Sequence, residues 1–201
     1  MYLNEIVPLF AKPLVKFSLE TEHEKWTEIL EERCNEENYL AMEDNYFIKD
    51  LNKDPVFDKL QDDIMHCVRY MVNDVYEFKD IEPYMVTMWG VGVKPTSYVR
   101  THYHSNSFIS GVYYPGDMDY APLRFYDTIN STIRPNIKKV NILNVPNSIQ
   151  KPMGGDLFLF PSHLKHDTLP NETDGIRLSI SFNVWIKGIV GDETSLTYLE
   201  L

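Results

Sequence analysis

Cysteine and long hydrophobic runs are the two features that this sequence has least of. Cys34 and Cys67 are its only thiols in 201 residues, too few for the disulfide framework of a small secreted domain. No stretch approaches the roughly 20 apolar residues of a membrane-spanning helix. The N-terminus has Glu5 where a signal peptide carries basic charge, and Pro8 breaks its apolar run. We therefore expect a cytoplasmic protein, in the host cytoplasm if its source is a virus, with no membrane partner.

Positive charge is also scarce. There are 19 Lys and Arg against 30 Asp and Glu, which gives a formal net charge of −11. A surface that binds phosphates needs the opposite sign, so we expect no nucleic-acid partner. The 43% hydrophobic and 13% aromatic residues are enough for a sizeable core. We predict a single domain over residues 1–201, with an N-terminal arm and supporting helices in 1–82 and a β-rich core in 83–201.

Two helices are predicted in the first part of the chain. Residues 21–34 begin with the pattern of a capping box and then repeat apolar residues at helical spacing. Asp54 followed by Pro55 is a typical helix start, and apolar residues continue that second helix to about residue 76. Residues 6–17 contain two prolines and are predicted to form an edge strand or an extended arm.

After residue 83 the pattern changes to short strands. Runs rich in Val, Ile, Tyr and Phe alternate with Gly, Pro, Asn and Asp, and the tail at 195–201 is a further candidate strand. Short strands behind two helices indicate a mainly β fold with flanking helices, a β-sandwich or jelly roll. The strands are expected at Tyr84–Val93, Tyr98–His104, Phe108–Tyr114, Leu123–Tyr126, Val140–Val145, Asp156–Phe160, Asp167–Leu169 and Ile176–Ile186.

The histidines of the β region have the spacing of a metal site. His102 and His104 are two residues apart, so on a strand both imidazoles point to the same face. A third ligand from a neighbouring strand would complete a set of three and leave positions open for substrate or dioxygen. His166 follows an apolar strand and is our candidate, with His163 in the same turn as its competitor. The alternative is that these are ordinary surface or core histidines.

Residues 177–183 alternate strictly between polar and apolar side chains. An inward-facing guanidinium is costly unless it meets an anion, and its fork matches a carboxylate with two hydrogen bonds. That carboxylate belongs either to a ligand or to one of the 30 acidic side chains. The alternation places Arg177, Ser179, Ser181 and Asn183 on one face and Leu178, Ile180 and Phe182 on the other.

In this order, the motifs resemble those of the non-haem iron(II), 2-oxoglutarate-dependent oxygenases, especially the prolyl-hydroxylase-like oxygenases of phage and bacterial genomes. The resemblance extends from about residue 85 to about 186. An N-terminal Pro-Leu-Phe segment and helices outside the barrel are also similar. The matching motifs are Ser-Tyr-Val-Arg before the two histidines, Ser-Gly-Val-Tyr-Tyr after them, then GDLFLFPSHLKH and RLSISFN.

This resemblance implies a double-stranded β-helix, a jelly-roll or cupin-like barrel, with iron(II) at its mouth and 2-oxoglutarate and dioxygen as co-substrates. His102 and His166 match metal-binding histidines of the family, and Arg177 matches the arginine that binds the far carboxylate of 2-oxoglutarate. Other matched residues help to bind that carboxylate or lie where they can reach the metal surroundings or the substrate. These are Tyr114 and Ser181 for the carboxylate and Asn183 for the metal surroundings or substrate.

The sequence departs from this family at position 104, where histidine replaces the usual Asp or Glu. Three neutral imidazoles leave iron(II) with its full charge, whereas a carboxylate would cancel one unit. We expect His102, His104 and His166 to be the metal ligands. Two alternatives stay open: a register shifted to His104-x-Asn106, or Asp167 as the missing carboxylate with His104 in a supporting position.

The family resemblance implies hydroxylation of a C–H bond with release of succinate and CO2. The substrate would be a prolyl-like side chain of a protein or peptide, or a small molecule, with determinants in the loops 115–122, 128–139 and 146–155. An oligomer is possible. Two other classes compete: a cupin-type three-histidine metal enzyme or binding protein, and a metal-free jelly-roll binding module. The cupin pattern expects a glutamate where Phe108 stands, and it gives no reason for an inward Arg177.

Overall fold

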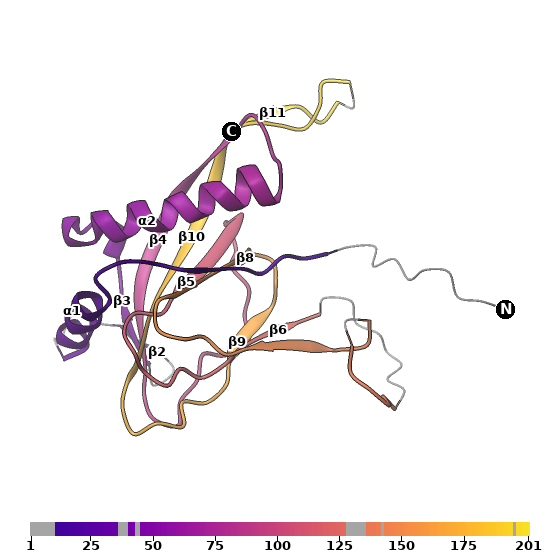
Figure 1. Cartoon of the computed structure of the whole chain (residues 1–201). Coiled ribbons are helices and arrows are strands. Elements are labelled where there is room, and N and C mark those ends of the chain that lie inside the picture. The colour runs from indigo at the N-terminus through magenta and orange to yellow at the C-terminus, as the bar shows by residue number, and fades with distance from the viewer. Residues whose placement is uncertain (1–10, 36–39, 43–44, 128–135, 142, 195) are drawn as a thin grey trace.

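A computed structural model of the chain describes residues 11–35, 40–42, 45–127, 136–141, 143–194 and 196–201. Its helices are α1 (His23–Asn35) and α2 (Asp58–Tyr70), and α2 lies across the long strands in Figure 1. Short 3-10 helices precede α2 and a π-helical turn follows it, at Leu51–Lys53, Pro55–Phe57 and Met71–Val75. The strands are β1 (Val15–Ser18), β2 (Leu40–Met42), β3 (Asn45–Ile48), β4 (Ile81–Val93), β5 (Ile109–Tyr113), β6 (Leu123–Tyr126), β7 (Asn147–Gln150), β8 (Asp156–Pro161), β9 (His166–Thr168), β10 (Arg177–Val190) and β11 (Leu199–Glu200).

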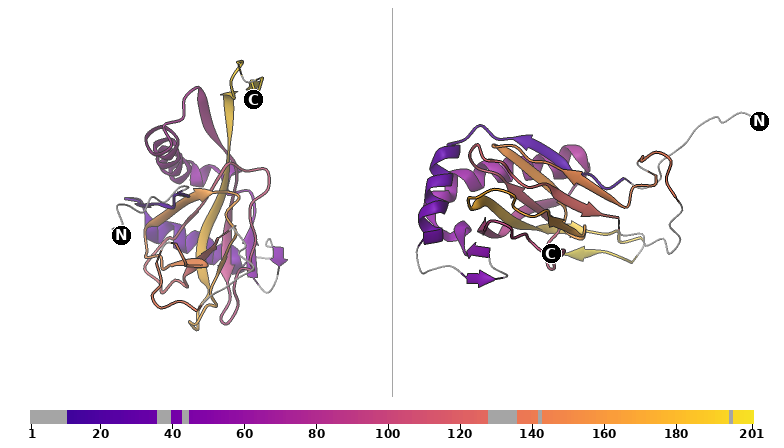
Figure 2. Two further views of the ribbon diagram at one scale, coloured as in Figure 1. Left: turned by 90° about the vertical axis from the view of Figure 1, so that its right-hand side faces the viewer. Right: turned by 90° about the horizontal axis from the view of Figure 1, so that it is seen from below.

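The strands form two antiparallel sheets (Figure 2). The larger sheet has the order β1-β8-β5-β10-β4-β3-β2, with β11 paired to the end of β10, and the smaller has the order β7-β6-β9. The central strand β10 pairs with β4 from Arg177 to Gly188 and with β5 from Ile180 to Val184. The predicted mainly β fold with flanking helices is therefore confirmed.

Alternating side chains give the larger sheet two different faces, because successive residues of a strand point to opposite sides. One face packs under the helices, and the other faces the smaller sheet. The alternation predicted for residues 177–182 is confirmed. Residues on the helix side include Leu157, Leu159, Leu178, Ile180 and Phe182, and those on the other side include Phe158, Phe160, Arg177, Ser179 and Ser181.

The helices cover the sheet with apolar residues at helical spacing. Trp26 and Leu30 of α1 and Ile64 of α2 have no exposed surface, as expected for the inward stripe of an amphipathic helix. The thiols Cys34 and Cys67 are free and buried, and burial raises the pKa of each to about 11. No helix in the described part of the chain is long and apolar enough to span a membrane.

The predicted strand at Val140–Val145 is wrong, because the asparagines of this segment form a turn. The backbone N–H of Leu143 donates to Oδ1 of Asn141, and that of Asn144 donates to the Asn141 carbonyl oxygen. Asn side chains that bond to nearby backbone groups compete with a strand ladder. The strand instead forms later, as β7, and residue 142 lies outside the described residues.

The sheet also contains two strands between α1 and α2 that were not predicted. β2 and β3 were not expected, and β3 extends the sheet by pairing with β4. Within the predicted N-terminal arm, β1 is the edge strand beside β8, while residues 6–10 lie outside the described residues. The tail contributes β11, although residue 195 is outside the described part, as are residues 128–135 of the loop expected to determine substrate choice.

The packing between β5, β8 and β10 leaves no room for a side chain at Gly111. A Cβ atom there would lie 2.7 Å from the backbone oxygen of Phe158 and would also meet the rings and methyl groups around it. We expect Gly111→Ala to lower the free energy of unfolding by about 1–3 kcal/mol, because the backbone cannot move away. Denaturant unfolding measures this change.

Gly175→Ala is the matched control for this prediction. Nothing lies within 4 Å of a Cβ at this position, so the free energy of unfolding should change by about 1 kcal/mol or less. Equal effects of the two substitutions would show that the packing around Gly111 is looser than described.

Candidate active site

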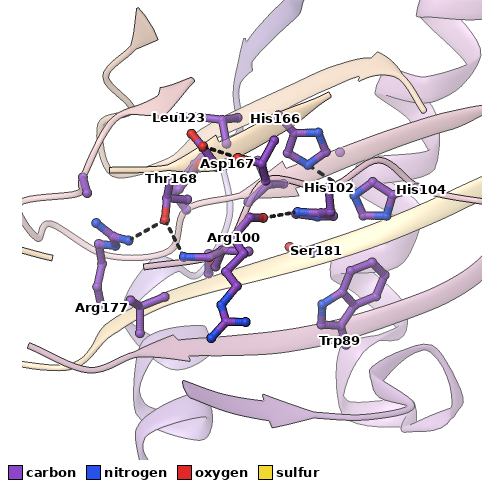
Figure 3. A pocket seen from close by; sticks show the side chains of 18 of the residues that line it. Trp89, Arg100, His102, His104, Leu123, His166, Asp167, Thr168, Arg177 and Ser181 are labelled. Carbon is purple, nitrogen blue, oxygen red and sulfur yellow. Dashed lines mark hydrogen bonds between the residues drawn. The ribbon is translucent and has the colours of Figure 1, made fainter. Parts of the chain in front are cut away.

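A cavity of about 490 Å³ lies between the two sheets. Its walls come from β3, β4, β5, β8 and β10 of the larger sheet, from β6 and β9 of the smaller sheet, and from the segment before β5. Figure 3 shows His102, His104 and His166 together at one side of this cavity and Arg177 at the other. The cavity therefore contains both of the features that the sequence analysis singled out.

The three histidines meet although two of them do not lie on a strand. The strand predicted at Tyr98–His104 is wrong, because this segment, which lies between backbone turns with positive φ at Thr96 (64°) and Asn106 (54°), forms one isolated β-bridge and no continuous ladder. The segment is nevertheless extended at His102. His102 and His166 form an isolated β-bridge in which each backbone N–H donates to the other's carbonyl oxygen at 2.9 Å.

The ring nitrogens of His102, His104 and His166 converge. One nitrogen of each ring lies within 4.8 Å of the others, and Nε2 of His104 is 3.3 Å from Nε2 of His166. In His102 and His166, Nδ1 is within hydrogen-bond distance of a backbone carbonyl oxygen, of Arg100 at 2.7 Å and of Leu164 at 2.8 Å. A carbonyl oxygen only accepts, so the proton of each neutral ring is on Nδ1 and the Nε2 lone pair is free to bind a metal.

Burial keeps the imidazoles of His104 and His166 neutral. Together with a smaller effect of the neighbouring His102, it lowers the pKa of His104 to about 4 and that of His166 to about 3. The neutral form is the one that coordinates metals. The three convergent lone pairs thus fit a divalent transition metal that accepts nitrogen ligands.

Arg177 is buried without an anionic partner. It is 5% exposed, its Nη2 donates to Oγ1 of Thr168 at a long 3.5 Å, and its Nη1 has no hydrogen-bond partner. Within the described residues no carboxylate forms an ion pair with it, so the ion-pair alternative for Arg177 is not seen there. Burial lowers the pKa of Arg177, and the nearby Tyr114, Tyr120 and Asp119 offset this only in part. A carboxylate ligand would supply the missing compensation.

The other predicted residues lie at different places around the cavity. Tyr114 and Ser181 line it, and burial raises the pKa of the Tyr114 phenol against the opposing effect of the Arg177 charge. Tyr114 is therefore a neutral hydroxyl near the guanidinium. Asn183 does not line the cavity; its Oδ1 accepts a hydrogen bond from Ser110 at 2.8 Å.

The alternative ligands are not brought to the histidine cluster. His163 and Asn106 are exposed and do not line the cavity. Asp167 lines it, but both carboxylate oxygens accept hydrogen bonds from other side chains. Burial would raise the pKa of Asp167, but these hydrogen bonds outweigh burial and lower it. Its lone pairs are already used within the protein.

Several wall residues were not identified from the sequence. Trp89 of β4 lines the cavity with its ring centroid 5.8 Å from that of His104. Phe47 lines it from β3, a strand that was not predicted. Thr168 contacts Arg177 and was not singled out. The HxH spacing pointed to the site, but nothing in these residues marks them individually as cavity residues.

The two facing sheets form a barrel that encloses three convergent histidines and an unpaired arginine. This arrangement is typical of a class of metal-dependent enzymes with an acidic co-substrate. Comparison with known proteins gives the family. Residues 87–183 match the model of the family described as "Putative 2OG-Fe(II) oxygenase". The segment 87–183 thus matches the 2OG-Fe(II) oxygenases, and it contains all three histidines and Arg177. No curated protein matches the chain.

Solved structures share the fold. A prolyl-4-hydroxylase from Pseudomonas putida has a TM-score of 0.59 and 15% identity, covering 85% of this chain and 91% of its own. The epimerase SnoN from nogalamycin biosynthesis has a TM-score of 0.67 and 11% identity, covering 88% and 81%. HygX from Streptomyces hygroscopicus with nickel and 2-oxoglutarate bound has a TM-score of 0.58 and 14% identity, covering 86% and 82%. The fold is thus the predicted double-stranded β-helix.

The geometry distinguishes His166 from its neighbour His163. We expect His166→Ala to weaken iron(II) binding by more than about 100-fold, because it removes one of three converging lone pairs rather than a supporting residue. His163→Ala should bind iron(II) like the parent protein. Anaerobic titration with iron(II) measures both affinities, and equal losses in the two variants would contradict the site.

Proposed function

We propose that this 2-oxoglutarate-dependent oxygenase hydroxylates a C–H bond, with His102, His104 and His166 holding iron(II) and Arg177 holding the far carboxylate of 2-oxoglutarate. The observation that carries the proposal is the unpaired, buried guanidinium in the same cavity as the three histidines. With iron(II) and 2-oxoglutarate bound, dioxygen would be activated, 2-oxoglutarate would yield succinate and CO2, and one oxygen atom would enter the substrate.

The protein's own contribution to this reaction is to bind and orient. Arg177 offers a fixed fork of donors, one of which has no partner among the described residues. Tyr114 and Ser181 line the same cavity, and we assign them to the carboxylate that Arg177 binds. Apolar walls such as Phe160 and Leu123 exclude water around these polar groups, which strengthens each of their electrostatic contacts.

The two competing classes are less well supported by the cavity. A cupin-type site would use the three histidines but would leave the Arg177 guanidinium buried without purpose. A metal-free binding module would give no reason for ring nitrogens of three histidines to lie within 4.8 Å of one another. The proposal that 2-oxoglutarate binds at one side of the cavity therefore depends on Arg177. The proposal that a metal binds at the other side depends on the histidines.

We infer that the substrate, a peptide side chain or a small molecule, reaches the metal beside His104. A groove with aromatic walls adjoins this histidine and contains Tyr76, Phe78 and Phe108. Rings of this kind favour an apolar or ring-bearing group. Among the neighbours are a prolyl-4-hydroxylase and a HygX structure with hygromycin B bound, so peptide and small-molecule substrates are both compatible with this fold.

The arginine assignment is tested without knowing the substrate. Anaerobic addition of iron(II) and then 2-oxoglutarate should give a weak visible charge-transfer band that requires both. Arg177→Gln should weaken 2-oxoglutarate binding, read from this band, by about 1.5–3 kcal/mol or roughly 10- to 160-fold, because charged hydrogen bonds are lost. Arg69→Gln, on the exposed face of α2, is the control. Unchanged binding by the Arg177 variant would refute the assignment.

The position of His104 generates a separate prediction. His104→Asp restores the carboxylate that the family carries at this position, so it should still bind iron(II) and cancel one unit of its charge. His104→Ala should lose iron(II) binding. Anaerobic metal titration of the two variants decides the question: equal losses would mean that His104 supports the site and is not a ligand.

A further inference from the structure

The histidines of the candidate site lie on two short segments with little regular structure of their own. His102 and His104 belong to an extended segment outside the sheets, and His166 begins β9, which has three residues. The β-bridge between His102 and His166 joins the two segments, and β6 pairs with the other side of β9. The mutual position of the imidazoles thus depends on how three adjacent segments are held together.

A single carboxylate connects these three segments. Asp167, next to His166 on β9, is 3% exposed. Its Oδ2 accepts from Oγ1 of Thr101 at 2.7 Å, from Nη2 of Arg124 at 2.9 Å and from the hydroxyl of Tyr126 at 2.7 Å, while its Oδ1 accepts from Nε of Arg124 at 2.9 Å. Thr101 precedes His102, and Arg124 and Tyr126 belong to β6.

We propose that Asp167 is a positioning residue for the metal site, acting through Thr101 on His102 and through its own backbone on His166. This inference rests on the proposed function, because it assumes that the histidines bind a metal. A carboxylate buried this deeply is costly unless all its lone pairs are used. Here the four hydrogen bonds satisfy the carboxylate. Because hydrogen bonds are directional, they also fix the positions of the two segments that carry the histidines.

The charge of the clamp, defined as Asp167 with Thr101, Arg124 and Tyr126, is balanced within itself. Arg124 forms a two-point ion pair with Asp167, with both contacts at 2.9 Å. The carboxylate therefore orients its neighbours without offering a free oxygen to the metal. This explains how an acidic residue adjoins a metal-binding histidine and yet does not act as a ligand.

The link through Thr101 gives the sharpest test. Thr101→Val removes the hydroxyl but leaves the Arg124–Asp167 pair, and Thr101→Ser keeps the hydroxyl. We expect Thr101→Val to weaken cobalt(II) binding by about tenfold and Asp167→Asn by about 10- to 100-fold, the range for supporting residues of metal sites. Thr101→Ser should restore parental affinity. Anaerobic cobalt(II) titration gives the affinities, and the visible cobalt spectrum reports whether the ligand geometry has changed.

Controls separate positioning from a merely structural role. Asp63→Asn makes the same substitution in an exposed ion pair with Lys59 on α2 and should bind cobalt(II) like the parent protein. Thermal unfolding of each metal-free variant measures stability independently. If Thr101→Val and Asp167→Asn bind cobalt(II) as tightly as the parent, with an unchanged spectrum, the positioning role is refuted. If the parent protein binds no cobalt(II), the proposed metal site itself fails.

Discussion

The two-residue alternation of β10 is the constraint on which the site depends. β10 lies between β5 and β4, so its side chains cannot be displaced sideways. Leu178, Ile180 and Phe182 face the helices and are essentially fully buried. This anchors the strand and forces Arg177 and Ser181 toward the cavity. A shift of one residue in register would expose the apolar set and bury the guanidinium among the helices, so the packing of the core also fixes the orientation of the arginine.

How much the sequence predicted depends on whether a feature is local. The alternation at 177–183 and the helix stripes are periodic, and periodicity survives folding because it reflects one buried face. The HxH pair was placed on a strand that does not exist, yet its convergence with His166 was anticipated. The reason is that an extended segment in a single β-bridge orients side chains as a strand does. The segment lacks the hydrogen-bond pattern of a strand, but the direction of its imidazoles does not depend on that pattern.

Several features that depend on contacts between distant residues were not predicted. The pairing of β3 with β4 brings Phe47 to the cavity, although the two paired segments are more than 40 positions apart in the sequence. No local sequence pattern predicts this pairing. Asp167 illustrates the same limit. From the sequence it was a candidate ligand because it follows a histidine. Its actual role depends on Arg124 and Tyr126, which reach it only because β6 pairs with β9.

In the proposed site, His104 stands where the family has a carboxylate, and this changes which property of the ligand would determine the strength of metal binding. A carboxylate attracts a cation through its charge, and this attraction tolerates some error in direction. A neutral imidazole offers one lone pair in the plane of its ring, so its binding strength depends on orientation. The site supplies that orientation through backbone carbonyl oxygens that fix Nδ1 of His102 and His166. In the proposed site, which has no charged ligand, metal binding would rely more heavily on residues that hold the histidines in place, and the buried carboxylate of Asp167, one residue away from His166, would have this role.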